Sequence, residues 1–545
     1  MMLKLARTLN RSVPQYRSPL YVGTTRSWSV IKGTNLDFDN IKDANSFKTN
    51  SELFRAIVVY TMCGIPFIVK NSESLLNLSQ KIIGEKATMG LVRATFFGHF
   101  CAGEDRSQVV PLMKRLGKYG VSGIMDYAAE EDVGEEEEEQ PLMEHRVEAR
   151  EGVVSARTYD YVTEEKCDAN MRIMLQAIDM AAETSDTPFA AIKITALGKP
   201  AFLERTSAIL KRIKSLWSEN FGCRKTEINL EEFQAGLKNI GIQLSPEDSE
   251  TLFRGIDNTS DGKIDYIEWT SSLQLEDMTT RKVFVRSGHN KSLITRNGVI
   301  PLLSEQETEL MDKLMERVNT IGEAAYKKGV RLLIDAEQTY MQPMINHIAL
   351  KLQRQYNKEK PIIYNTYQCY LKSAKNRIKN DIRRAEREGW FFAAKLVRGA
   401  YMVQERKRAE DMGYQSPICA TIEETHNNYN DCVRLLLGNI DHVALMLATH
   451  NRRSIELAVE RMKELDIAPE YGIYFGQLLG MSDNLTFPLG INGYKVFKYV
   501  PYGPIEEVLP YLIRRAQENS SILSSSDNEL KMLLKEAKRR MFSKE

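Results

Sequence analysis

Short apolar runs rich in β-branched and aromatic residues alternate along this chain with longer stretches of helical periodicity. Eight such runs predict strands, and most intervals between them leave room for one helix. This alternation predicts βα units joined into a parallel sheet. Eight units, about 250 residues in all, are what a (βα)8 barrel of the TIM type requires. The predicted strands are Val121–Tyr127, Ala190–Leu197, Val330–Glu337, Ile362–Tyr370, Phe392–Arg398, Val443–His450, Ile473–Leu478 and Lys495–Val500.

Polar side chains interrupt most of these apolar strands within or just past their C-terminal halves. Buried parallel strands are normally apolar throughout, so each interruption needs a reason. Any one of them could be a hydrogen-bonded core residue or a strand end. Together they indicate a functional mouth, because the C-terminal ends of barrel strands face the catalytic side. These residues are Asp126, Lys193, Asp335, Glu337, Gln368, Arg398, His450, Gln477 and Tyr499.

The remaining segments divide the chain around this α/β barrel. Residues 37–115 look helical and predict an N-terminal arm, and residues 526–545 are expected to form a C-terminal tail. The barrel is expected over 116–220 and 276–525, with an acidic surface loop over 130–144 that contains five consecutive glutamates. Residues 221–275 have a signature of their own and are expected to be an inserted module.

That insert contains a twelve-residue EF-hand calcium loop from Asp257 to Glu268. Gly262 stands where such loops turn sharply, and Ser245-Pro246 predicts the start of the preceding helix. A second, upstream loop is expected to pair with it but lacks chelating residues at its first positions. The sequence therefore predicts one calcium-loaded loop, or an EF-hand fold kept for packing. The expected ligand positions are Asp257, Thr259, Asp261, Lys263, Asp265 and Glu268.

Composition and charge exclude several classes of protein. Of 545 residues, 43% are hydrophobic and 27% charged, which is typical of a folded globular chain. The net charge is +1, so no global field favours nucleic acid. Seven cysteines without paired spacing favour a reducing compartment, and no apolar run is long enough to span a bilayer. Residues 1–36 hold six basic and no acidic side chains, which predicts a mitochondrial transit peptide.

The expected mouth is net basic, which favours an anionic substrate group or cofactor. Lys193, Lys395 and Arg398 lie on the predicted strands, and the pair Arg514-Arg515 follows the last strand on an apparent helix. An arginine pair on a helix could equally be a solvated face. Signatures of zinc proteases, P-loop enzymes, nucleophile-elbow hydrolases and Rossmann dinucleotide sites are missing from the sequence. Residue patterns alone therefore predict a basic barrel mouth but do not identify its cofactor.

Four segments resemble the proline dehydrogenase family, and the likeness covers about 190–200 and 300–525. The resemblance implies a distorted (βα)8 barrel that binds FAD non-covalently and oxidises L-proline to 1-pyrroline-5-carboxylate. It also implies ubiquinone as electron acceptor, peripheral contact with the inner mitochondrial membrane, and a place on its matrix side. The four segments are Leu332–Glu337, Lys395–Tyr401, Phe475–Met481 and Tyr511–Asn519.

The resemblance also implies roles for particular residues. Asp335 and Lys395 would be catalytic, although many bacterial members exchange Arg and Lys at positions 395 and 398, which leaves their separate roles open. The substrate-binding positions would be Lys193, Tyr401, Tyr499, Tyr511, Arg514 and Arg515. The flavin-binding positions would be Ala336, Gln368, Arg398, Gly399, Ala400, Thr449 and His450.

Two alternatives stay open on the sequence. The first is a hydroxyproline dehydrogenase, a relative in which the position of Tyr499 tends to be Ser; Tyr499 therefore favours proline. The second is a calcium-binding interaction protein built on an inactive barrel.

Overall fold

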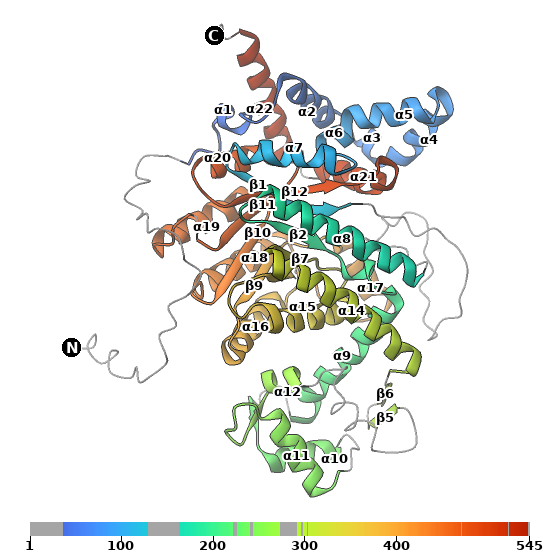
Figure 1. Cartoon of the computed structure of the whole chain (residues 1–545), viewed down its shortest axis with the longest axis vertical. Helices are drawn as coiled ribbons and strands as arrows, with labels where there is room; N and C mark the ends of the chain where they lie inside the picture. Colours follow the sequence, from blue (N-terminus) through green and yellow to red (C-terminus); the bar gives the residue numbers. More distant parts are fainter. Residues whose placement is uncertain are drawn as a thin grey trace, which may run out of the picture.

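The computed structural model describes residues 36–128, 163–221, 226–239, 244–272, 292–295, 298–301, 303–469, 471–521 and 523–542 (Figure 1). The expected acidic loop over 130–144 and nearly all of the expected transit peptide lie outside these residues.

A closed barrel of eight parallel strands forms the centre of the molecule (Figure 1). Strands that follow one another around the barrel also follow one another along the chain, and β1 closes the ring by pairing with β12. All eight predicted strands are present, so the (βα)8 prediction is confirmed. The strands are β1 Val121–Tyr127, β2 Phe189–Ile192, β7 Arg331–Ile334, β8 Ile363–Gln368, β9 Phe392–Val397, β10 Val443–Ala448, β11 Ile473–Leu478 and β12 Val496–Tyr502.

The second strand is shorter than the apolar run predicts. β2 ends at Ile192, and Ile194–Ala196 form a 3-10 turn, η4. Contacts from outside the sheet hold this turn: the Asn170 side chain donates to the carbonyl of Ala196, and Thr195 donates to the Glu337 carboxylate. A β-branched apolar run fits a strand and a buried turn equally well, so the sequence could not separate them.

Alternation along the strands explains which side chains enter the barrel. Leu333, Ala393 and Phe497 belong to the cluster that fills its interior. Successive strand residues point to opposite faces, so the residues two positions later point inward as well, one layer closer to the mouth. Those residues are Asp335, Lys395 and Tyr499.

Ten helices of the described chain surround or follow the strands, and local sequence signals set several of their ends. The helix α14 begins at a capping box of Ser304 with Glu307 and ends at Gly329, whose φ of 66° suits glycine. The ten are α8 Glu164–Thr184, α9 Pro200–Phe221, α14 Glu305–Lys328, α15 Gln342–Tyr356, α16 Ala374–Glu388, α17 Met402–Asp411, α18 Ile422–Leu437, α19 Arg452–Glu464, α20 Asp483–Ile491 and α21 Ile505–Ser521.

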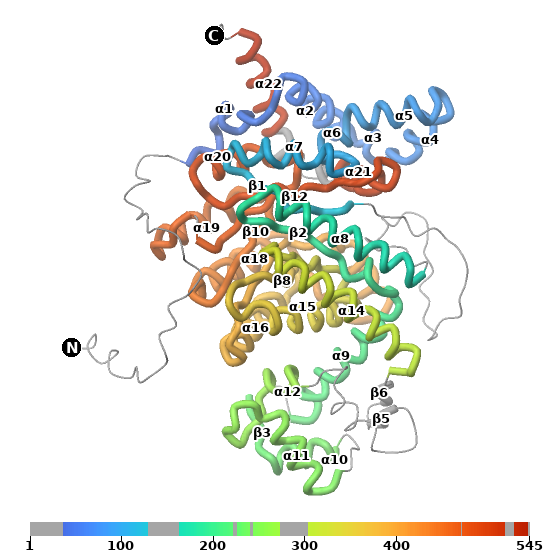
Figure 2. The backbone as a smooth tube through the Cα atoms, viewed as in Figure 1, coloured from blue at the N-terminus to red at the C-terminus, as the bar shows by residue number. Residues whose placement is uncertain are grey.

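An arm of helices lies across one side of the barrel, and the last helix of the chain packs against it (Figure 2). Leu53, Ala56 and Tyr60 of the arm form a buried cluster with Leu533 of α22. The expected C-terminal tail is thus mostly helix. The elements are α1 Ile41–Ala44, α2 Asn50–Cys63, α3 Pro66–Lys70, α4 Ser72–Ile83, α5 Glu85–Val92, the π-helical turn η3 Arg93–Phe97, α6 Gly98–Phe100, α7 Arg106–Gly117 and α22 Leu523–Phe542.

The insert extends from the end of α9 as a small helical module (Figure 1). Its aromatic core, with Phe233, Phe253 and Trp269, joins the hydrophobic core of the barrel through Phe221. Two short antiparallel strands join its halves. The elements are β3 Glu227–Ile228, α10 Leu230–Asn239, α11 Pro246–Ile256, β4 Ile264–Asp265 and α12 Tyr266–Ser272, followed by the hairpin β5 Ser292–Thr295 and β6 Gly298–Pro301.

In the described part of the chain, every helix is too short or too polar to cross a bilayer.

Candidate active site at the mouth of the barrel

Three side chains from separate strands meet at the mouth, and we call Asp335, Lys395 and Tyr499 the mouth trio. The Lys395 Nζ lies 2.5 Å from Asp335 Oδ1, and the Tyr499 hydroxyl donates to Asp335 Oδ2 at 2.9 Å. The same ammonium lies 5.5 Å from the centre of the Tyr499 ring. Asp335 is 8% and Lys395 5% exposed, so this ion pair is largely removed from water.

Two neighbouring carboxylates at the mouth titrate in opposite directions. Burial disfavours the charge of Asp335, but Lys395, Lys193 and the Tyr499 hydroxyl outweigh it and lower the pKa of Asp335. Burial raises the pKa of Glu337 to about 7, although hydrogen bonds from Thr195 and the charge of Lys193 act against it. The mouth therefore holds one firmly ionised carboxylate beside another that exchanges a proton near neutral pH.

Arg398 directly follows β9, and its side chain points away from the barrel interior, toward α18 and α19. Its guanidinium donates to His426 Nδ1, Thr449 Oγ1 and Ser454 Oγ, and it lies 4.5 Å from the centre of the Tyr429 ring. All of these partners are uncharged groups. The sequence left the separate roles of Lys395 and Arg398 open. Their surroundings differ, because Lys395 has a carboxylate partner whereas these partners of Arg398 are uncharged.

The other expected site residues lie around the same mouth. Gln368 donates to the backbone carbonyl of Glu337 at 2.7 Å. Gly399 has a φ of +129°, and a Cβ there would meet the Tyr370 ring at 2.6 Å, so only glycine fits. The expected substrate side chains are mostly buried: Lys193 5%, Tyr401 5%, Tyr511 4% and Arg515 2% exposed, with Arg514 less so. The Arg515 guanidinium lies 5.1 Å from the centre of the Tyr511 ring.

His450 follows the end of β10, and its ring is held by a residue that the sequence did not identify. Its Nδ1 lies 2.9 Å from Ser482 Oγ. Burial, together with the charges of Lys498, Arg515 and Arg398, lowers the pKa of His450 to about 3. The imidazole is therefore neutral at physiological pH.

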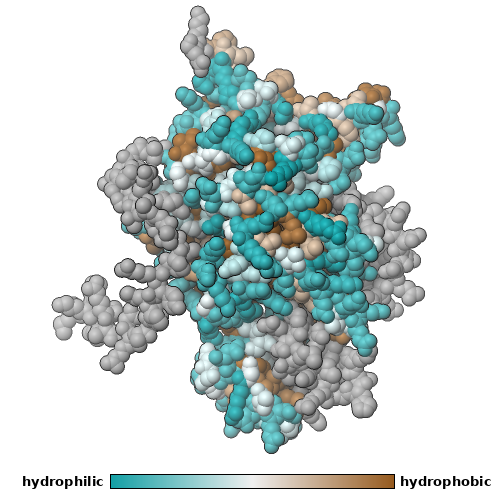
Figure 3. Space-filling model, viewed as in Figure 1, coloured by the Kyte–Doolittle hydropathy of each residue, from teal (hydrophilic) through white to brown (hydrophobic). Residues whose placement is uncertain are grey.

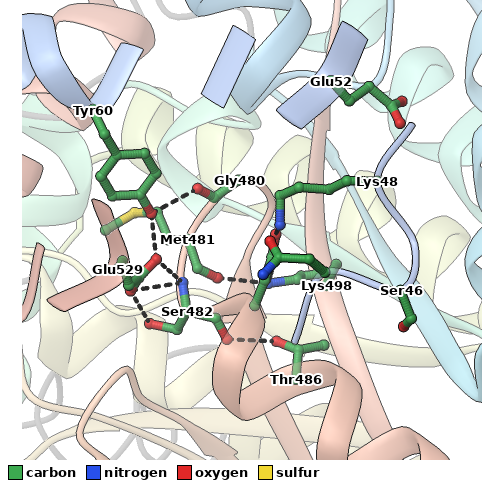
Figure 4. A network of polar contacts seen from close by, with 12 residues as sticks. Ser46, Lys48, Glu52, Tyr60, Gly480, Met481, Ser482, Thr486, Lys498 and Glu529 are labelled. Carbon is green, nitrogen blue, oxygen red and sulfur yellow. Dashed lines mark hydrogen bonds and ion pairs between the residues drawn. The ribbon is translucent and has the colours of Figure 1, made fainter. Parts of the chain in front are cut away.

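A buried polar network outside the barrel was also missed (Figure 4). Lys498 of β12 points outward between Tyr499 and Phe497, and it pairs with Asp483 at 2.6 Å. Lys48 of the arm pairs with the same carboxylate, while the Tyr60 hydroxyl donates to Glu529 of α22. Lys498 was the available signal, because a lysine within an apolar strand requires a buried partner.

The loop from Asp257 to Glu268, which the sequence predicts as an EF-hand loop, turns at Gly262. Gly262 has a φ of +77°, and its N–H donates to Asp257 Oδ2 at 2.9 Å. Glu268 accepts from the Thr259 hydroxyl and from the Asp265 amide, and Asp265 also pairs with Arg387 of α16 at 2.7 Å. In the described residues, no group of three or more Asp, Glu, His or Cys side chains converges as metal ligands.

The mouth offers features suited to an anionic cofactor. Both side-chain polar atoms of Gln338, a residue 1% exposed, have no hydrogen-bond partner within the described part of the chain. Arg398 is a largely buried cation with uncharged partners, and the backbone of Gly399 and Ala400 is exposed beside it. Cationic and amide donors next to open backbone match the phosphate and polar ring groups of a dinucleotide.

A closed (βα)8 barrel with buried ionisable groups at the C-terminal ends of its strands defines a barrel enzyme. Comparisons with known proteins narrow this class. Residues 110–528 match the family model described as proline dehydrogenase. Proline dehydrogenase 1, mitochondrial, of Homo sapiens is 38% identical, with 93% of this chain and 90% of the relative aligned. The chain belongs to the proline dehydrogenase family and is an oxidoreductase.

More distant relatives have other names. Hydroxyproline dehydrogenase of Xenopus laevis is 31% identical, with 92% of this chain and 91% of the relative aligned. Among solved structures, proline utilization A of Bdellovibrio bacteriovorus aligns with a TM-score of 0.52 at 17% identity. That alignment covers 89% of this chain but only 38% of the larger protein, and it shows a shared fold alone.

Proposed function

We propose that this protein oxidises L-proline to 1-pyrroline-5-carboxylate with non-covalently bound FAD, as the first step of proline catabolism. The observation that supports this most directly is the mouth trio, a buried cation and carboxylate bridged by a tyrosine at the catalytic side of the barrel. Family membership supports the same reaction.

Arg514 and Arg515 would bind the carboxylate of proline. Planar guanidinium groups suit a carboxylate because they donate two parallel hydrogen bonds. Lys193, Tyr401, Tyr499 and Tyr511 would then surround the pyrrolidine ring. Burial of Lys193, Tyr401, Tyr511 and Arg515 supports the proposal, since a site that excludes water strengthens each of these interactions.

The trio would prepare the substrate rather than act as a strong base. Bound FAD would supply the acceptor for the hydride that leaves the ring carbon next to the nitrogen. The nitrogen lone pair assists only if the amine is neutral, and the positive charges of Lys395 and Lys193 favour that neutral form. Asp335 is a weak base because Lys395 holds its pKa low, so it would orient the amine by accepting a hydrogen bond.

FAD would be held by the positions around β8, β9 and β10. Arg398 would supply positive charge, and the exposed backbone at Gly399 would allow close approach. Gln338, which was not expected from the sequence, has a free amide suited to the same ligand. The other proposed contacts are Ala336, Gln368, Ala400, Thr449 and His450.

We further propose that electrons pass to ubiquinone, with the protein peripheral to the matrix side of the inner mitochondrial membrane. An apolar patch on α3 to α5 supports membrane contact (Figure 3). Exposed Lys70, Lys81 and Lys86 outnumber the exposed Glu73 and Glu85 on these helices, and their charge would attract anionic lipid. A variant with Ile82→Glu and Ile83→Glu should no longer float with vesicles that contain anionic lipid. The patch consists of Phe67 (66% exposed), Leu78 (50%), Ile82 (71%), Ile83 (52%) and Leu91 (56%).

Calcium binding to the insert is also proposed. Support for this proposal comes from the carboxylates of Asp257, Asp261 and Glu268, which lie on one loop that turns at Gly262. Binding would require Glu268 to exchange its present hydrogen bonds for the ion. Isothermal titration of the flavin-loaded protein with calcium tests this proposal, and absence of heat would leave the module a packing element.

Spectra recorded during anaerobic titration with L-proline test the main proposal. Flavin bands that bleach with proline would support FAD as the cofactor, proline as the substrate and a catalytically active protein. Flavin that bleaches only with hydroxyproline would favour hydroxyproline dehydrogenase activity, which is the name of the Xenopus laevis relative. A protein that takes up no FAD would contradict the proposal and favour an interaction protein on an inactive barrel.

A further inference from the structure

The turn between β11 and α20 is held by elements from both ends of the chain (Figure 4). Lys498 of β12 donates to the carbonyl of Met481 at 2.6 Å, and the Tyr60 hydroxyl lies 3.1 Å from the carbonyl of Gly480. Ser482 lies at the end of this turn with a φ of 53°, a left-handed conformation that costs free energy for a residue other than glycine. Such a conformation persists only where the surroundings enforce it.

Glu529 is the group that enforces it from the last helix. The amide of Ser482 donates to both carboxylate oxygens of Glu529 at 3.2 Å, and Ser482 Oγ lies 3.5 Å from Oε1. The Tyr60 hydroxyl donates to Oε2 at 2.5 Å. Ser482 is 4% exposed, so the carboxylate and the amide meet away from bulk water.

The other side of Ser482 faces the candidate active site. Its hydroxyl lies 2.9 Å from Nδ1 of His450, which leaves Nε2 as the ring nitrogen available to a ligand. A serine hydroxyl has one proton to donate. If that proton points toward Glu529, Nδ1 of His450 must carry a proton and Nε2 becomes an acceptor.

We propose that Glu529 is a positioning residue for His450, and that it acts through Ser482 to fix the orientation and tautomer of the imidazole. The proposal rests on the proposed function, in which His450 contacts FAD. The C-terminal helix thereby helps to form the flavin site although Glu529 itself touches no flavin atom.

The test measures FAD binding to the flavin-free protein by quenching of flavin fluorescence, with Glu529→Gln, Ser482→Ala and the double variant. Each single change should raise the Kd for FAD about tenfold, the effect of one buried hydrogen bond to a charged group. The double variant should bind as Ser482→Ala does, because the same pathway is already broken. Lys535→Gln, an exposed change on the same helix, should bind FAD as wild type does.

Three outcomes would overturn the proposal: wild-type affinity in Glu529→Gln, additive losses in the double variant, or a lower melting temperature with unchanged FAD affinity. If Glu529→Gln does not fold, Tyr60→Phe removes one hydroxyl from the same carboxylate. It should raise the Kd about threefold, and only where Ser482 is intact. Failure of wild type itself to bind FAD would instead contradict the proposed function.

Discussion

The barrel mouth and the EF-hand-like insert both contain acidic side chains, but they use different partners. At the mouth, Asp335 meets Lys395 and Tyr499 from strands that are 60 and more than 160 residues away in the sequence. In the insert, Asp257 and Glu268 mostly accept hydrogen bonds from amides and hydroxyls of their own loop. The first arrangement depends on the complete fold, whereas the second is local to one loop.

Replacing Lys395 should have the largest effect. Lys395→Met removes the cation from a buried carboxylate and from the proposed substrate pocket, and should lower kcat/KM for proline about a thousandfold. Steady-state assays with an artificial electron acceptor measure this. Lys375→Met is the matched control, because Lys375 forms an exposed ion pair with Asp431 and should leave turnover unchanged.

The same variant should invert a pH dependence. In the wild type, the lowered pKa of Asp335 contributes stability above about pH 4, and this is lost as the pH falls through the folded-state pKa. Without Lys395, burial dominates and raises that pKa, so Asp335 should lower stability as the pH rises above about 4. Unfolding in urea at a series of pH values measures the stability of both proteins. Parallel curves of stability against pH would contradict the predicted inversion.

The Glu337→Gln variant tests the second buried carboxylate of the mouth, which is not part of the mouth trio. A pKa raised to about 7 means that the folded state binds the proton more tightly, so wild-type stability falls as the pH rises from about 4.5 to 7. The variant has no such loss. The free energy of unfolding of the variant minus that of wild type should therefore be about 2–3 kcal/mol larger at pH 8 than at pH 5.

Exposed Glu316 provides the control for this measurement, since Glu316→Gln should show the wild-type pH dependence. An equal pH dependence in the Glu337→Gln protein would mean that Glu337 is ionised in the folded state at all of these pH values.

Much of the fold could be predicted because parallel barrel strands have a distinctive pattern. Eight apolar runs gave eight strands, and period-two alternation places Asp335, Lys395 and Tyr499 one layer above Leu333, Ala393 and Phe497. The same alternation separates Lys395 from Arg398. The turn after Ile192 was missed, since the groups that hold it, Asn170 and Glu337, lie on other elements.

The network around Ser482 could not be predicted for a related reason. Tyr60 lies more than 400 residues before Asp483 and Glu529, and no local pattern relates the three. Only the packing of the arm and α22 against the barrel brings them together. The loop from Asp257 to Glu268 is the opposite case, because its turn follows from spacing within twelve residues.

Tyr499→Ser tests the substrate that the mouth selects. Shortening this side chain makes room for a ring hydroxyl, so the ratio of kcat/KM for hydroxyproline to that for proline should rise about tenfold. Tyr499→Phe is the matched control: it keeps the ring, loses only the hydrogen bond to Asp335, and should retain the preference for proline. An unchanged ratio in the serine variant would contradict the role of Tyr499 in specificity.

Glu268→Gln should have the smallest effect on turnover, less than about twofold, because the insert contacts the barrel helices α9 and α16 rather than residues of the mouth. Calcium should raise the melting temperature of wild type and of the exposed control Glu231→Gln, but not of Glu268→Gln, since binding to the folded state alone stabilises it. A severalfold change in wild-type turnover on addition of calcium would contradict the prediction that the insert and the barrel mouth act independently. The ion pair of Asp265 with Arg387 would then be the first contact to examine, because a loop ligand and a barrel helix share it.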